Sequence, residues 1–120
     1  MTYNEKVTEV DINETTKLMF NKCINRGKTT TTKQLEAEGC TFHGRVKAKT
    51  IKITHSQAKA PIKGTNSVNL WNVLGCPRVT AKGDIRMDEC GYIPVVRSEK
   101  TLSLHLCTLA DKVTTPTAII

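Results

Sequence analysis

The chain has 120 residues, a formal net charge of +7 and 38% hydrophobic residues. Its length favours one basic domain, residues 1–112, followed by a weakly ordered tail at 113–120. No apolar run reaches the roughly 20 residues of a membrane span, and the polar start of the chain argues against export. We therefore expect a cytoplasmic protein without a membrane partner.

The N-terminal half shows helical spacing. Residues 11–27 are predicted to form a helix that ends at Gly27, because apolar side chains recur at three- and four-residue steps: Ile12, Met19, Phe20, Cys23 and Ile24. Two shorter helices are predicted at 33–38 and 41–48, the first from a capping-box pattern that begins at Thr31.

The pattern changes at residue 50. Residues 50–54 alternate and are β-branched, which predicts a strand. Residues 55–66 are typical of a loop, and 68–74 fit either a helical turn or a strand. The C-terminal third predicts an antiparallel meander with strands at 78–81, 85–88, 92–96 and 101–109. The expected fold class is α+β, with short N-terminal helices followed by a small antiparallel β-meander, and no internal repeat is recognised.

The segment from the first helix to residue 54 resembles a winged helix-turn-helix protein. Its parts would be a support helix at 13–26, a second helix at 32–38, a turn at Gly39-Cys40, a recognition helix at 41–48 and a strand at 50–54. The resemblance implies a DNA-binding transcriptional regulator whose third helix lies in the major groove. Arg45 is then placed for a bidentate contact to guanine.

The charge is unevenly distributed along the chain. Residues 1–14 carry a net charge of −3, residues 15–83 carry +11, and residues 84–120 carry −1, while residues 39–83 contain no acidic residue. Such a block indicates an external anion. The predicted function is a small viral or bacterial nucleic-acid-binding protein, with these candidate contacts: Lys33, Arg45, Lys47, Lys49, Lys52, Lys59 and Lys63.

The kind of nucleic acid follows from the shortage of aromatic residues. Only Phe42 falls near the basic cluster, which argues against base stacking on a single strand and favours duplex DNA or structured RNA. In a second arrangement, Arg45, Lys47 and Lys49 alternate on one face of a strand rather than on a helix. The alternative function is a structural or interaction protein, such as a viral particle component or an inhibitor that docks on an acidic partner. The apolar Ile119 and Ile120 would then be captured by a neighbouring chain, and a homodimer is one such assembly.

Cysteine and histidine patterns offer little chemistry. The five cysteines are odd in number and widely spaced, which favours reduced thiols over a disulfide framework. Cys40 with His43, and His105 with Cys107, are weak candidates for a zinc site. No nucleophile motif or phosphate loop is present, so we expect no cofactor and no enzymatic activity.

Overall fold

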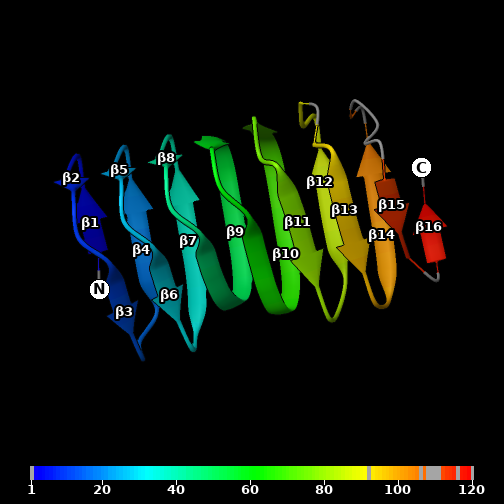
Figure 1. The fold of residues 1–120 in the computed structure, drawn as a ribbon, viewed down its shortest axis with the longest axis horizontal. Coiled ribbons are helices and arrows are strands. Elements are labelled where there is room, and N and C mark those ends of the chain that lie inside the picture. The colour runs from blue at the N-terminus through cyan, green and yellow to red at the C-terminus, as the bar shows by residue number, and fades with distance from the viewer. Residues whose placement is uncertain (1, 92, 106, 108–111, 116, 120) are drawn as a thin grey trace.

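The computed structural model describes residues 2–91, 93–105, 107, 112–115 and 117–119. These residues form strands and no helix, so the described part of the chain contains no helix that could span a membrane. The strands lie side by side along a body about 36 Å long, with the N-terminus at one end and the C-terminus at the other (Figure 1).

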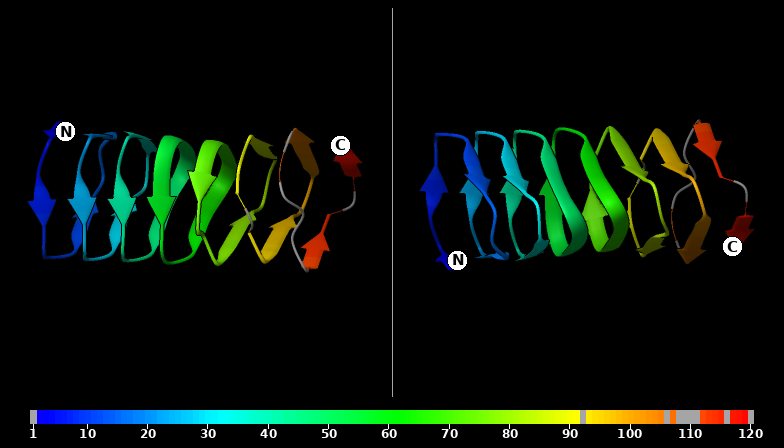
Figure 2. Two further views of the ribbon diagram at one scale, coloured as in Figure 1. Left: turned by 90° about the horizontal axis from the view of Figure 1, so that it is seen from above. Right: turned by 90° about the horizontal axis from the view of Figure 1, so that it is seen from below.

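The strands pair in parallel at a nearly constant sequence spacing. Leu18 pairs with Leu35, Leu35 with Ile51, and Ile51 with Val68. The same spacing continues from Val68 to Ile85. A chain that returns to the same position about every 17 residues winds into stacked coils, which defines a β-solenoid. Figure 2 shows the successive coils edge-on.

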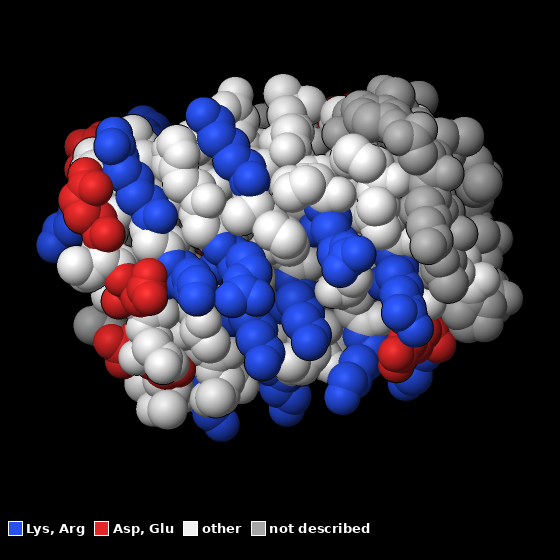
Figure 3. Space-filling view, viewed as in Figure 1, with Lys and Arg blue, Asp and Glu red and all other residues white. Residues whose placement is uncertain are grey.

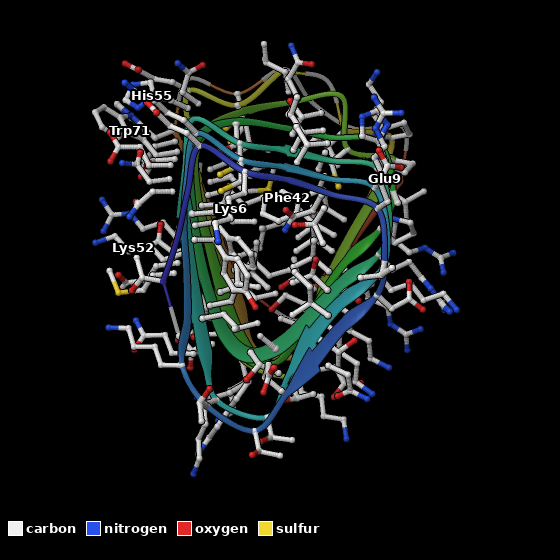
Figure 4. The ribbon with its side chains drawn as sticks, turned by 90° about the vertical axis from the view of Figure 1, so that its left-hand side faces the viewer. Lys6, Glu9, Phe42, Lys52, His55 and Trp71 are labelled. Atoms are coloured by element: carbon white, nitrogen blue, oxygen red, sulfur yellow. The ribbon has the colours of Figure 1, made fainter. Side chains whose placement is uncertain are left out.

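Each coil has three sides, which we name faces A, B and C (Figure 4). Face A carries β3 (Ile12–Glu14), β6 (Thr29–Thr31), β11 (Arg78–Ala81), β13 (Val95–Ser98) and β15 (Lys112–Thr114). Face B carries β1 (Thr2–Asn4), β4 (Leu18–Asn21), β7 (Gln34–Glu38), β12 (Ile85–Asp88), β14 (Thr101–His105) and β16 (Thr117–Ile119). Face C carries β2 (Val7–Thr8), β5 (Ile24–Asn25) and β8 (Thr41–Phe42). The two long strands, β9 (Val46–Ala58) and β10 (Ile62–Leu74), run over all three faces in turn.

The core lies inside the coils. Along each strand, side chains alternate between the interior and the solvent, so the inward positions of one coil stack on their equivalents in the next coil. The column Leu18, Leu35, Ile51, Val68, Ile85 and Leu102 is almost completely buried. At the N-terminal end, Tyr3 stacks on Phe20 with ring centroids 4.9 Å apart, and Phe20 meets Phe42 edge-on.

The corner between faces B and C has an unusual backbone. Its residues all have positive φ, between 48° and 64°, and they recur at the coil spacing: Glu5, Lys22, Gly39, His55, Asn72 and Glu89. Six successive coils therefore turn this corner with one residue in the left-handed region. The Lys22 and Gly39 amides each donate to a carbonyl of the next coil, Glu38 at 2.9 Å and Thr54 at 3.1 Å. The corner is thus part of the coil-to-coil ladder.

The predicted α+β fold is wrong, and with it the helix-turn-helix arrangement. The segment predicted as a helix at 11–27 contains β3, β4 and β5, and the other two predicted helices contain β7, β8 and the start of β9. The apolar spacing at 11–27 arises because the chain turns corners between short strands. Ile12, Phe20 and Cys23 point inward from three different parts of the coil, whereas Met19 is 39% exposed on face B.

The predicted strands fare better than their arrangement. Strands at 78–81 and 85–88 are confirmed as β11 and β12, and the strand at 50–54 lies within β9. The predicted loop at 55–66 is wrong, because it lies mostly within β9 and β10.

The antiparallel meander predicted for the C-terminal third is also wrong, since β11 pairs in parallel with β10 and β13. The predicted strand at 92–96 begins only at Val95. Of the predicted strand at 101–109, residues 106, 108 and 109 lie outside the described residues.

The structure also places strands in the segment predicted as a weakly ordered tail. β15 (Lys112–Thr114) includes the first two residues of this segment and pairs with β13. β16 (Thr117–Ile119) pairs with β14. Residues 116 and 120 lie outside the described residues, so the predicted capture of Ile120 concerns a part that is not described.

Candidate functional site

Face A carries a column of outward side chains at one register position. Thr30 pairs with Lys47, Lys47 with Lys63, Lys63 with Thr80, and Thr80 with Arg97. Neighbouring strands lie about 4.8 Å apart, so Lys47 and Lys63 start from adjacent backbones. The three basic members of the column are exposed because they occupy the solvent-facing half of the alternation. The column runs parallel to the long axis of the solenoid.

A shallow groove of about 590 Å³ follows this column across face A. One acidic side chain, Glu99, lines the groove. Seven basic side chains line it as well: Lys28, Arg45, Lys47, Lys63, Arg78, Lys82 and Arg97. Figure 3 shows basic side chains gathered across the middle coils of this side of the molecule, with acidic side chains toward its two ends. We call this set of seven residues the basic groove.

The basic groove is not neutralised from within. The ion pairs of the described residues join Lys17 to Glu36, Arg26 to Glu9, and Asp88 to both Arg86 and His105, and none includes a basic-groove residue. Like charges opposite each other on adjacent strands lower stability. Seven cations on one face without a carboxylate partner therefore form an electrostatic surface that an external anion would stabilise.

The candidate contacts from the sequence divide among different parts of the surface. Arg45, Lys47 and Lys63 meet in the basic groove. Lys33 and Lys49 lie at the corner between faces A and B, where the Lys49 amide donates to the Lys33 carbonyl at 3.0 Å. The remaining two lie elsewhere: Lys52 on face B and Lys59 at the corner between faces C and A.

Four basic-groove residues were not among the proposed contacts: Lys28, Arg78, Lys82 and Arg97. Their signal in the sequence is the coil spacing. Lys28 precedes Arg45 by one coil, and Arg97 follows Lys63 by two coils through Thr80. Because the sequence analysis recognised no repeat, it could not place Arg97 beside Lys47 and Lys63, which are distant from it in the sequence.

Three buried cysteines share one inward column of the coils. Cys23, Cys40 and Cys90 are buried at equivalent positions, and the Cys23 amide donates to the Cys40 sulfur at 3.4 Å. In the coil after Cys40, Ser56 occupies the same position and accepts a hydrogen bond from the Cys40 amide at 3.0 Å. The described residues contain no disulfide.

The weak zinc candidates do not meet. The Cys40 thiol points inward, and Cys107 lies four coils further on at the same register position, about 19 Å away at the strand spacing. His43 is exposed, and His105 is exposed on face B beside Asp88, at 3.6 Å. Among the described residues, no group of three or more histidine, cysteine or acidic side chains is placed to hold a metal ion.

Fold and surface together define the class of this protein: a short parallel β-solenoid with a basic groove along one face. Comparison with known proteins finds no matching family, no matching curated protein and no matching solved structure.

Proposed function

We propose that this protein is a rigid, non-catalytic β-solenoid that binds nucleic acid along face A. The observation that supports the proposal is the basic groove, in which seven cations from five successive coils face solvent without an ion-pair partner among the described residues. Binding would rest on contacts to phosphates, because a flat sheet of short strands offers no element that enters a groove deeply enough to read bases.

The dimensions favour a duplex that lies along the solenoid axis. From Lys28 to Arg97 the groove spans four coil-to-coil steps, about 19 Å at the usual strand spacing. One strand of duplex DNA presents a phosphate about every 3.4 Å along its axis, so about six phosphates fall within this length. The groove residues include no aromatic side chain on which single-stranded bases could stack.

Salt dependence tests the proposal. Polarisation of a labelled duplex should report binding whose log K falls with log salt at a slope of about −4 to −6, as expected for five to seven phosphate contacts. The variant Lys47→Glu/Lys63→Glu should bind about ten-fold or more weakly and lose about two units of slope.

A variant of equal charge provides the control. Lys22→Glu/Lys52→Glu changes the net charge by the same amount but alters the B–C corner and face B, so it should bind almost as the parent does. Equal losses in both variants would mean that only the total charge matters. Absence of binding to duplex DNA, structured RNA and single-stranded DNA alike would overturn the proposal.

We infer, as a second candidate, a structural role in which two copies associate through their N-terminal coils. In the described part of the chain, β1, β2 and β3 each pair with only one neighbour, so the outer edge of this coil is open. Val7 and Val10 beside it are 58% and 70% exposed. An open strand edge with apolar side chains favours pairing with another chain. Sedimentation velocity at rising protein concentration tests this, and a monomer throughout contradicts it.

A further inference from the structure

Face B carries a different column from face A. Asn4 pairs with Asn21, Asn21 with Glu38, Glu38 with Thr54, and Thr54 with Trp71. Every outward position of this column before Trp71 thus holds an amide, a carboxylate or a hydroxyl, at intervals of about 4.8 Å. A groove of about 490 Å³ follows the column and ends at Trp71.

Trp71 is the single tryptophan of the chain, and it is not used in the core. Its side chain is 44% exposed, although the inward positions on either side of it, Leu70 and Val73, are buried and apolar. His55 holds the indole ring from the neighbouring coil, with ring centroids 4.9 Å apart and an interplanar angle of 60°. Figure 4 shows His55, Trp71 and Lys52 projecting from one side of the solenoid, away from Phe42 in the core. The partly exposed indole therefore lies at the end of the groove, in contact with His55.

The groove is close to neutral. Glu36 is already paired, because it lies 3.6 Å from Lys17 and accepts a hydrogen bond from the Gln34 amide at 2.8 Å. Glu38 and Lys52 remain, one of each sign, and neither forms an ion pair with a residue that the structure describes. A polyanion would meet Glu38 here, so this groove differs in chemistry from the basic groove on face A.

We propose that the face-B groove binds a linear, uncharged oligosaccharide. A pyranose ring has an apolar face that stacks on an exposed indole and a rim of hydroxyl groups that both donate and accept hydrogen bonds. Trp71 provides the stacking surface, Glu38 accepts from hydroxyls, and Asn21 can donate and accept. Because these groups repeat once per coil, a chain of sugars along the axis meets a polar side chain at each step.

The single tryptophan provides the readout. Titration of the purified chain with cellohexaose, xylohexaose, laminarihexaose or chitohexaose should give a saturable change in Trp71 fluorescence for at least one of them, and calorimetry should give the same affinity. Trp71→Ala should weaken binding about ten-fold or more in calorimetry, whereas Trp71→Phe should recover part of the loss. Glu38→Gln should weaken binding several-fold, because a charged acceptor becomes a neutral amide.

Two controls keep the test specific. Leu74→Ala removes a side chain of almost equal exposure, 45%, on neighbouring face C and should leave the affinity unchanged. Lys47→Glu/Lys63→Glu should also leave it unchanged, so that failure of this proposal and failure of nucleic-acid binding are separate results. Thermal unfolding verifies that Trp71→Ala is folded. No saturable change with any of the four sugars at millimolar concentration, or equal binding by Trp71→Ala, overturns the proposal.

Discussion

Buried thiols show how single residues contribute to this fold. The sulfurs of Cys76 and Cys90 donate hydrogen bonds to backbone carbonyls, such as Cys76 to Arg78 at 3.1 Å, and both side chains are almost inaccessible. Burial raises the pKa of Cys76 from 9.0 to about 11 and that of Cys90 to about 12, although hydrogen bonds from the backbone partly oppose this. A neutral thiol at these positions therefore fits the core, whereas a thiolate does not.

These pKa values predict a loss of stability in alkali. Above pH 9.0 the unfolded chain releases protons from these thiols while the folded chain retains them, so the free energy of unfolding falls as pH rises from 9.0 toward 12. Each thiol lowers the free energy of unfolding by up to about 1.4 kcal/mol for every pH unit in this range. Urea unfolding on both sides of pH 9.0 should show a flatter pH dependence for Cys76→Ala and Cys90→Ala than for the parent. An unchanged slope in both variants would contradict the buried, protonated thiols.

At the scale of the element, the corner between faces B and C concentrates backbone strain. Lys22, with φ of 53°, occupies a conformation that costs an L-residue roughly 1–2 kcal/mol, whereas Gly39 in the next coil occupies it freely. A Cβ at Gly39 would meet only the Lys22 residue, at 3.5 Å from its side chain, which is an ordinary contact. The difference between the two positions is therefore conformational rather than steric.

Substitutions at this corner should have opposite signs. Lys22→Gly should raise the free energy of unfolding by up to about 1 kcal/mol, and Gly39→Ala should lower it by about 1 kcal/mol. Lys59→Gly is the matched control, because Lys59 is also exposed but does not have positive φ, and it should be mildly destabilising. Urea unfolding measures all three. A destabilised Lys22→Gly would show that strain at this corner is absent.

The strands explain why sequence patterns predicted some elements and missed others. β11 and β12 are short, β-branched or alternating, and bounded by turns, so their ends were predicted correctly. The first helix was predicted because Ile12, Phe20 and Cys23 recur at helical steps, yet those steps cross corners between strands. Local spacing cannot distinguish an amphipathic helix from short strands joined by sharp turns. The basic groove shows the same limit of local patterns. Arg45, Lys47 and Lys63 lie in one acid-free block of the sequence and were predicted as contacts. Arg97 lies outside that block, and only the stacking of the coils brings it to the same groove.

At the scale of the whole molecule, the first described coil differs from the later ones in what it places inside. Lys6 occupies the position at which the next two coils place Cys23 and Cys40, and Figure 4 shows it pointing inside the outline of the ribbon. Lys6 is exposed, and in the described part of the chain no strand pairs with the outer edge of its coil. An inward-pointing charge at an open edge opposes pairing with another chain. If two copies associate as proposed above, Lys6 should oppose the pairing that exposed Val7 and Val10 favour.

Replacing this lysine should change assembly. Lys6→Val should increase the fraction of dimer, because the open end then presents a continuous apolar surface, and Val10→Lys should reduce it. Sedimentation velocity at matched concentrations measures both. Lys52→Val, which changes the same residue type in the extended strand β9 away from the open end, should leave the fraction of dimer unchanged. A Lys6→Val chain that sediments as the parent does would exclude the N-terminal coil as an interface.

The sequence by itself determined the basic character of the middle block, the location of several short strands and part of the charged set, because these depend on composition and on neighbours along the chain. The tertiary structure alone decided that the basic residues separate onto different faces and that Arg97 and Lys28 belong with Lys47. It also decided that Trp71 stands in one column with polar side chains of the earlier coils. The physical reason is the winding. Parallel coils place residues that are a full coil apart in sequence side by side, on strands about 4.8 Å apart. The pattern of residues within one strand gives no information about which residues of other coils lie beside it.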